Sequence, residues 1–236
     1  MKKKQLKRNF ILAVLFLLPV MFVLVLSLSE DHYNPLDIVH ENVAELPENP
    51  EGIMLKDHIT VLAFLGSEPL DMLIAASNLK ELVYDKFKGF KKFQIVALVP
   101  KGAEADSETL FREIALYEDL RFWHFVHAEP ETIKNTFNSL KASFQLSDNL
   151  ASDNVFIIDT DLNQRGRIDD RTDNEIEANK PVYGLNAYNC IQVAVIKNKM
   201  SSEDLRVLFT EYRQKRKGNF NSESRRASDL KSSSNE

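Results

Sequence analysis

Thiols are almost absent from this chain, because Cys190 is the single cysteine among 236 residues. One cysteine cannot form a disulfide within the chain, so a folded domain has to draw its stability from a hydrophobic core. Cys190 is available for pairing with a second chain, but its apolar setting in YNCIQVAVI favours a buried, idle thiol.

Positive charge is scarce over most of the chain. Beyond Glu30 the sequence holds 25 of the 30 Lys and Arg residues and 34 of the 35 Asp and Glu residues, which gives a formal net charge of −9. No basic stripe interrupts this acidic composition. An acidic surface repels phosphate groups, so the sequence argues against binding of nucleic acid or of anionic lipid headgroups.

The N-terminus has the opposite character. Residues 1–9 form a basic end that contains MKKKQLKR, and residues 10–28, FILAVLFLLPVMFVLVLSL, carry no charge. About 20 apolar residues in a helix span a bilayer, so we predict a transmembrane helix or uncleaved signal anchor over 10–28. Since cytoplasmic ends carry an excess of Lys and Arg, this predicts a single-pass protein of a bacterial inner membrane with its domain in the periplasm.

Cleavage of the apolar segment is the alternative. Ser27-Leu28-Ser29 has the small-x-small pattern of a signal peptidase site, which would leave a domain secreted to the periplasm. The apolar run is longer than the roughly 7 to 15 residues of a signal-peptide core, which favours the anchor. No cysteine directly follows the run, so the sequence argues against a lipid-modified N-terminal cysteine.

Residues 29–56 and 57–217 differ in pattern. The first segment is polar, contains three prolines and has no sustained period, so we predict a tether. From residue 57, ITVLAFL and FQIVALVP are apolar runs typical of strands buried on both faces, and RFWHFVH alternates as a third strand. Segments with helical spacing lie between and after these strands. Alternation of strands and helices indicates βαβ crossovers and a largely parallel sheet.

The pattern changes near residue 154. NVFIIDTDLNQRGRIDD contains two strands with only residues 160–163 between them, which predicts an antiparallel hairpin. CIQVAVI is a strand or a short helix, and a closing helix begins at Ser201 with Asp204 in a weak capping box. The order β-α-β-α-β-α-β-β-α is that of a thioredoxin-like α/β fold, a mixed sheet flanked by helices. Serine-rich residues 218–236 are predicted to be a disordered tail.

Two stretches resemble a known family. FWHFVHAEPETIKNTFNSL followed by VFIIDTDLNQRGRIDD is similar to the corresponding part of the Sco/SenC family, membrane-anchored thioredoxin-like proteins that help to deliver copper to cytochrome c oxidase. The resemblance covers roughly residues 58–170 and the last helix. It implies a thioredoxin-like domain outside the cytoplasm and, in the family, a copper site of two cysteines in the first loop and one histidine ahead of the hairpin.

This chain departs from the family at all three ligand positions. In VLAFLGSEPLDML, Glu68 and Met72 stand where the cysteines are expected, and the histidine position falls near Ala151 and Ser152. Ser67, Glu68 and Met72 therefore form a degenerate active-site loop, in which we expect Ser67 to cap a helix. Copper prefers soft thiolate and imidazole ligands, and this chain lacks both at the expected positions. The resemblance therefore implies the fold and the compartment of the family, and we expect neither a metal site nor another cofactor.

Other residues do not replace the missing chemistry. His124 and His127 are three apart on a predicted strand, so they point to opposite faces and cannot chelate one ion. Disulfide exchange and peroxide reduction require a thiolate, best placed at a helix N-terminus. Cys190 is the only candidate for that role.

A charged cluster and a tyrosine-containing loop remain. Arginine forks suit recognition of a partner's carboxylates, whereas the alternative is a solvated hairpin edge whose charges prevent mispairing. The possible interaction surface consists of Asp161, Arg165, Arg167, Asp169, Asp170, Arg171, Tyr183 and Tyr188.

The leading hypothesis needs none of the absent residues. It is a membrane-anchored, non-catalytic thioredoxin-like domain that binds a protein partner in the cell envelope, linked through the resemblance to respiratory-oxidase assembly. One alternative is a copper-handling protein of the Sco type with an altered ligand set. The other is a thiol-redox enzyme that uses Cys190.

Overall fold

The computed structural model describes residues 2–28, 35–116 and 118–217. The chain divides into two compact units, residues 1–34 and 35–236. The described part of the first unit is one helix, α1 (Lys2–Leu28), which contains Pro19. By length and hydropathy, none of the helices in the described part of the chain qualifies as a membrane span.

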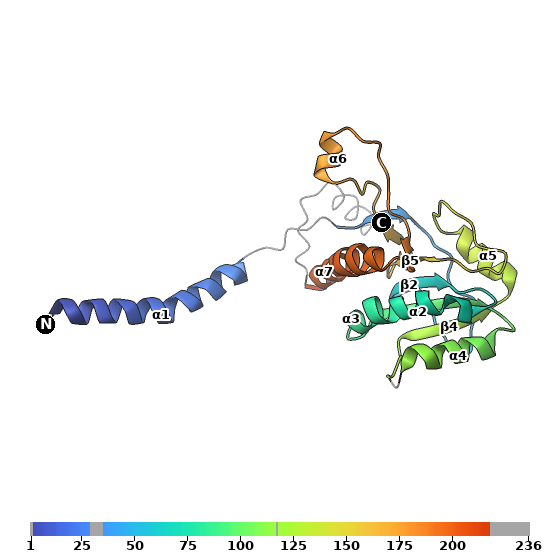
Figure 1. The fold of residues 1–236 in the computed structure, drawn as a ribbon, viewed down its shortest axis with the longest axis horizontal. Helices are drawn as coiled ribbons and strands as arrows, with labels where there is room; N and C mark the ends of the chain where they lie inside the picture. The colour runs from blue at the N-terminus through green and yellow to red at the C-terminus, as the bar shows by residue number, and fades with distance from the viewer. Residues whose placement is uncertain (1, 29–34, 117, 218–236) are drawn as a thin grey trace. The chain divides into compact units, whose positions relative to one another are not determined.

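The second unit is built on a seven-stranded mixed sheet. The strands are β1 (Asp37–His40), β2 (Ile59–Phe64), β3 (Phe93–Pro100), β4 (Trp123–Ala128), β5 (Asn154–Ile158), β6 (Gln164–Gly166) and β7 (Tyr188–Asn189). Their order is β1-β6-β5-β2-β3-β4, with β7 paired to β5 (Figure 1). β2, β3 and β4 are parallel, whereas β5, β6 and β1 are antiparallel to their neighbours.

Helical segments connect the strands and close the fold. They are η1 (Pro69–Met72), α2 (Leu73–Leu79), η2 (Lys80–Tyr84), α3 (Asp85–Phe87), α4 (Glu104–Ala115), α5 (Pro130–Asn138), α6 (Asp173–Glu177), η3 (Val195–Asp204) and α7 (Leu205–Lys217). The predicted order β-α-β-α-β-α-β-β is confirmed from β2 to β6, and the closing helix is present, but α6 and β7 lie between β6 and that helix and were not predicted. A mixed sheet flanked by helices in this order is consistent with a thioredoxin-like fold.

Two hydrophobic clusters fill the two faces of the sheet. Successive side chains of a strand point to opposite faces, so Val61 and Ala63 of β2 belong to one cluster and Leu62 and Phe64 to the other. The first cluster packs against α2, α4, η3 and α7, and the second packs against α5 and the irregular segment 43–55. All six residues of β2 are buried, as the continuous apolar run predicts.

The segment predicted as a tether contributes to the folded unit. Residues 29–34 lie outside the described residues, but β1 adds an antiparallel edge strand beside β6. Five apolar side chains of this segment are buried without a regular period, because most of it follows an irregular path over the sheet. They are Leu36, Val39, Val43, Leu46 and Leu55. The compact unit therefore begins at Pro35, earlier than the predicted boundary at residue 57.

The closing helix begins earlier than predicted. CIQVAVI is helical from Val193, and η3 runs directly into α7. Ser201 and Asp204 are buried within this helix, so they do not form the predicted capping box. The predicted disordered tail, residues 218–236, lies outside the described residues.

Candidate functional site

The loop between β2 and η1 occupies the predicted position after a buried strand. Gly66 has φ +72°, and a Cβ atom at that position would lie 2.6 Å from the carbonyl oxygen of Asn149. The backbone N–H of Ser67 donates a hydrogen bond to the same oxygen at 2.8 Å. A glycine is required here because the backbone is both left-handed and in close contact with the segment ahead of β5.

The segment that contains Ala151 and Ser152 pairs with the end of β2, directly before the loop. Ala151 forms an isolated β-bridge with Leu65, and the Ser152 N–H donates to the carbonyl of Phe64 at 2.9 Å. The position expected for the histidine therefore lies beside the loop. Ser67 and Glu68 are exposed, whereas Met72 is 8% exposed. The three side chains offer a hydroxyl, a carboxylate and a thioether, without a thiolate or an imidazole.

Ser67 does not cap the following helix. The N-cap of η1 is Glu68, and no side-chain hydrogen bond caps this helix. Pro69 is the first residue of η1 and has no N–H to satisfy, which removes one of the donors that a capping serine would bind. The predicted capping role was wrong by one position, because the helix begins at Pro69 and its N-cap is therefore Glu68.

The two strand histidines face different surroundings. Nδ1 of His124 lies 3.9 Å from a carboxylate oxygen of Glu51, whereas Nε2 of His127 lies 3.2 Å from the hydroxyl oxygen of Ser107 in α4. Burial lowers the pKa of His124. Within the described ranges, no three His, Cys, Asp or Glu side chains are grouped to hold a metal ion.

Cys190 is inaccessible. Its side chain is 1% exposed, and its Sγ lies 2.8 Å from the carbonyl oxygen of Asp153, to which the thiol donates. Burial raises the pKa of the thiol to about 12. Because the thiolate is the nucleophile in disulfide chemistry, this cysteine is poorly suited to redox catalysis.

The predicted interaction surface is wrong for Arg165 and Tyr188, both of which are completely buried. Arg165 lies between two buried carboxylates, with Nη1 3.0 Å from Asp159 and Nη2 2.6 Å from Glu211. Its Nη2 also donates to the carbonyl of Leu36 at 2.8 Å. Burial lowers the pKa of Arg165, but Glu211 and Asp159 together outweigh that effect and raise it.

Arg167 and Tyr188 converge on Asp204, which is completely buried. The Tyr188 hydroxyl donates to Asp204 at 2.6 Å, and the Arg167 Nε donates to the same carboxylate at 2.9 Å. Asp161 lies apart from this group, in the turn between β5 and β6, where its N–H donates to Asp159 at 2.9 Å. The sequence predicted a capping role for Asp204 and did not reveal its buried contacts, because its partners lie 16 and 37 residues away.

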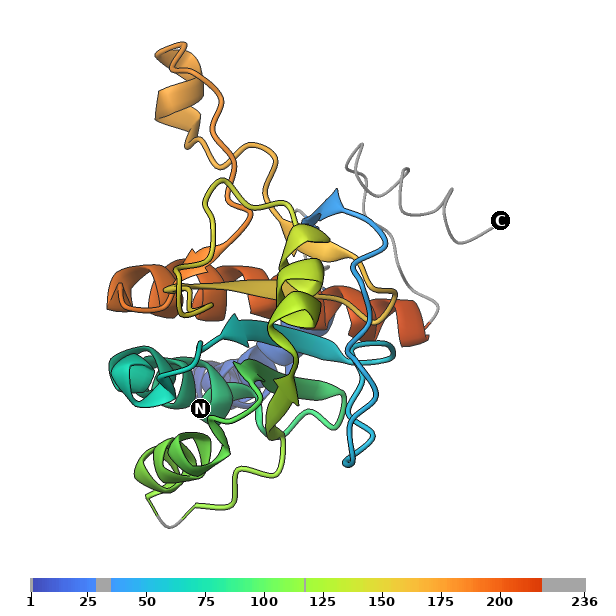
Figure 2. The same ribbon diagram turned by 90° about the vertical axis from the view of Figure 1, so that its right-hand side faces the viewer.

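Residues 167–185, which we call the arm, leave the sheet and return to it. At its base, Arg167 and Leu185 exchange two backbone hydrogen bonds of 2.9 and 2.8 Å, and the Asp170 N–H donates to Tyr183 at 2.9 Å. A Cβ atom at Gly184 would lie 2.8 Å from the Arg167 carbonyl, so glycine permits this close approach. Figure 2 shows α6 at the tip of the arm, projecting away from the sheet.

Glu175 organises the tip of the arm. It forms a capping box with Thr172, and it also accepts hydrogen bonds from Tyr183 at 2.8 Å and from Lys180 at 3.1 Å. The Thr172 N–H, with these side chains, lowers the pKa of the Glu175 carboxyl to about 2. The sequence TDNE carries the capping-box signature, so this short helix was detectable before the structure.

The arm exposes apolar side chains although it is well ordered by polar contacts. Arg171 lies 2.8 Å from Asp169 and donates to the carbonyl of Lys180 at 2.7 Å. Between these contacts the arm exposes Ile168 (56%), Ile176 (47%), Val182 (60%) and Tyr183 (45%). Four large apolar groups on one projecting segment are typical of a contact surface.

Comparison with solved structures finds likenesses at low identity. A SCO1/SenC family lipoprotein from Bacillus anthracis str. Ames is 14% identical, with 73% of this chain and 100% of that chain covered and a TM-score of 0.43. The apo Sco1 protein from Thermus thermophilus is 13% identical, with 74% and 91% covered and a TM-score of 0.41. No family model and no curated protein matches the chain. What the site can do therefore follows from its own residues.

Proposed function

We propose that this protein is a non-catalytic, Sco/SenC-like member of the thioredoxin-like superfamily that binds a protein partner in the bacterial cell envelope. One observation carries the proposal. The loop at the usual reactive position presents Ser67, Glu68 and Met72, while the only thiol of the chain is buried with a raised pKa. Thiol-redox chemistry needs an accessible thiolate, and a soft copper site needs more than one thioether.

Location is part of the same proposal. The uncharged run of residues 10–28 behind a basic end supports an inner-membrane anchor with the domain on the periplasmic side. The resemblance to Sco/SenC proteins supports a role in respiratory-oxidase assembly or a neighbouring task. Binding rather than catalysis is the activity that fits a scaffold without reactive groups.

The arm is the contact element that we propose. Its exposed apolar side chains, Ile176 and Val182 among them, are held on a projecting segment by the Glu175 and Arg171 hydrogen bonds. Pre-ordering of a binding segment reduces the conformational entropy lost on association. Aromatic and aliphatic groups surrounded by charges also match the composition of interface centres and rims.

Site-specific photocrosslinking in cells of the source organism tests this proposal. A photoreactive residue is placed at Val182 in the arm and, as the matched control, at Lys134, which is exposed on α5. We expect one discrete protein adduct from Val182 and none from Lys134. Adding Ile176→Asp should lower the yield at Val182 at least about fivefold, because a charge replaces an apolar contact.

Equal adduct yields at Val182 and Lys134 would contradict partner binding through the arm. So would an adduct at Val182 that is insensitive to Ile176→Asp. Circular dichroism of each variant shows whether the domain is folded, because Ile176 and Val182 are exposed and their replacement should leave the core intact.

A further inference from the structure

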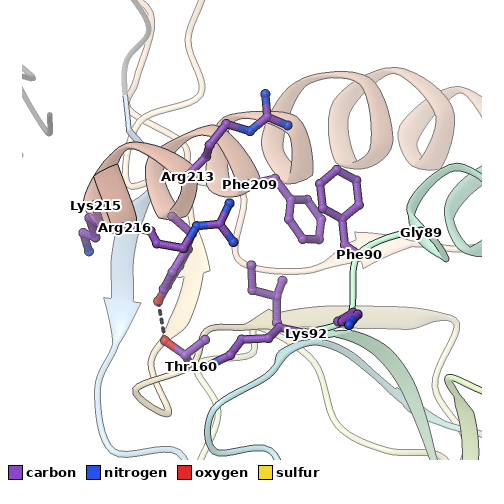
Figure 3. A pocket seen from close by; sticks show the side chains of 11 residues that line it. Gly89, Phe90, Lys92, Thr160, Phe209, Arg213, Lys215 and Arg216 are labelled. Atoms are coloured by element: carbon purple, nitrogen blue, oxygen red, sulfur yellow. Dashed lines mark hydrogen bonds between the residues drawn. The ribbon is translucent and has the colours of Figure 1, made fainter. Parts of the chain in front are cut away.

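A cavity of about 670 Å³ opens at the end of the sheet where β2 and β3 begin, and no residue of the arm lines it. Four parts of the chain line it. Ile59 starts β2, residues 89–92 lead into β3, and the last turns of α7 lie above them, with Thr160 between (Figure 3). Small-molecule sites in proteins typically enclose about 300 to 1,000 Å³, so this cavity is large enough for a ligand.

The floor of the cavity is apolar and aromatic. The rings of Phe90 and Phe209 stack with centroids 4.4 Å apart, and Ile59 lies beside them with 2% exposure. Phe90 remains 37% exposed, so the edge of this stack is open to solvent. At the other end, the Thr160 hydroxyl donates to the Tyr212 hydroxyl at 2.9 Å. The floor therefore offers a surface for a flat or linear apolar group.

The rim of the cavity is strongly basic. Five cationic side chains line it, although the sequence after Glu30 is acidic overall and shows no basic stripe. They are Lys91, Lys92, Arg213, Lys215 and Arg216. Folding joins two short basic segments that are more than 100 residues apart, which is why the sequence did not reveal this cluster. The predicted absence of a basic surface is therefore wrong at this one place.

Acidic side chains compensate only part of this charge. Lys215 lies 2.9 Å from Glu211, a carboxylate that also pairs with the buried Arg165, and Lys92 lies 4.0 Å from the exposed Asp57. Among the residues that the structure describes, Arg216 has no ion pair within 4.0 Å. The rim therefore retains net positive charge.

The basic side chains differ in whether they point toward the cavity. Figure 3 shows the Arg216 guanidinium reaching over the cavity from α7 and Lys92 on the opposite wall near Thr160, whereas Arg213 turns away. Basic residues at the end of a helix also interact favourably with the helix dipole, which accounts for Arg213 and Lys215 without a ligand. That explanation does not apply to Lys92, which directly precedes β3 and faces the same space.

We propose that this cavity binds an amphipathic anion, with its apolar body on the Phe90–Phe209 stack and its carboxylate or phosphate between Lys92 and Arg216. The arginine fork presents parallel N–H donors that match the oxygens of either group. Stacked rings beside the charged rim bind the apolar part by removing its surface from water. Two sources share this chemistry, an anionic lipid and a water-soluble organic acid.

The test uses the full chain in nanodiscs of zwitterionic phosphatidylcholine. The probe is a trifluoromethyl-phenylbutyrate, followed by fluorine NMR line broadening against empty nanodiscs, with its neutral amide as the matched ligand. We expect saturable binding of the acid and at least about tenfold weaker binding of the amide, because the amide lacks the charge. Arg216→Gln and Lys92→Gln should each weaken binding of the acid about tenfold, whereas Lys101→Gln, on an exposed pair with Glu129, should not.

Lipid composition distinguishes the two sources. If the natural ligand is an anionic lipid, replacing part of the phosphatidylcholine with phosphatidylglycerol should displace the probe. If it is a soluble acid, the probe should stay bound. Absence of saturable binding, equal affinity for acid and amide, or equal affinities of the Arg216→Gln and Lys101→Gln proteins would overturn the proposal.

Discussion

At the scale of single residues, Arg165 is the most constrained charge in the described chain. It is fully buried between Asp159 and Glu211, and it also reaches the backbone of Leu36. Taking such charges out of water costs several kcal/mol, so the group is stable only while each charge keeps its partners. The same side chain joins the hairpin, the last helix and the edge strand.

Replacement of Arg165 should therefore be severely destabilising. We expect Arg165→Met to lower the free energy of unfolding by about 3 to 5 kcal/mol, because two buried carboxylates lose their shared cation. Urea denaturation followed by circular dichroism measures the change.

Lys215→Gln is the matched control for Arg165→Met. Lys215 pairs with the same Glu211, but its side chain is 35% exposed, so we expect a loss of only about 0 to 1 kcal/mol. If Arg165→Met and Lys215→Gln lowered the free energy of unfolding by similar amounts, the two buried carboxylates would not depend on Arg165.

The sequence did not identify Arg165 as a buried residue. DTDLNQRGR was interpreted as an exposed charged hairpin because arginines are rarely buried without a partner. Its partner Glu211 lies 46 residues further on, in a helix whose apolar stripe gave no sign of a buried acid. By contrast, the strand before the loop follows from its continuous apolar run, and its end pairs with the segment ahead of β5 through Leu65 and Ala151.

At the scale of elements, the arm depends on one carboxylate. Glu175 accepts hydrogen bonds from the Thr172 N–H at 3.0 Å and from the Tyr183 hydroxyl, and so connects the two limbs of the arm. A short helix such as α6 has little intrinsic stability, so its order derives from these contacts.

We expect Glu175→Ala to loosen α6 without unfolding the domain. Without the capping box the helix opens more often, so we expect about fivefold faster amide hydrogen exchange at Ile176 and Ala178. Glu177→Ala, in the same helix, is the control and should leave both rates unchanged. Faster exchange in β2 and β3 would instead indicate that the whole domain is destabilised.

The same carboxylate determines how the arm responds to acid. The pKa of Glu175 is about 2 in the folded arm against an ordinary value of 4.5, so its stabilising effect is present above pH 4.5 and is lost as the pH falls through about 2. Carbon NMR of the carboxyl group should therefore show titration near pH 2 in the wild-type chain. Titration near pH 4.5 would mean that the capping box is not formed.

Elements with strong patterns were predicted well, and those held by distant contacts were not. β2 and β3 are continuous apolar runs, and β5 and β6 form the predicted hairpin, with residues 159–163 between them where residues 160–163 were predicted. β1 was missed because DIVH lies among prolines and acidic residues and is ordered by β6, far along the chain. The start of η3 was missed because its residues pack against η2 and β7, and no local period records such distant contacts.

At the scale of the whole molecule, the folded unit begins at the edge strand. Leu36 and Val39 are 2% and 8% exposed, and β1 covers the side of β6 that would otherwise be an open edge. Segment 35–40 therefore belongs to the domain rather than to a linker.

Two fragments of the chain test this boundary. We expect residues 35–236 to unfold cooperatively in urea. Residues 41–236 should be less stable by about 3 to 6 kcal/mol, because two buried aliphatic side chains each contribute about 1.5 to 3 kcal/mol. If the two fragments had equal urea midpoints, residues 35–40 would not stabilise the domain, and its boundary would lie nearer to residue 57.

The pairing of β1 with β6 also determines how a mechanical load would pass through the protein. Asp37, which leads toward the N-terminal unit, pairs with Gly166, which leads directly into the arm. A pull between the N-terminus and a partner on the arm would therefore act on the same end of this ladder and open it bond by bond. The Asp37 carboxylate, which accepts from the Ile168 N–H at 2.8 Å, stands first in that path. Under such a load, we expect the β1–β6 pairing at the sheet edge to break first, because the force does not pass through the central strands.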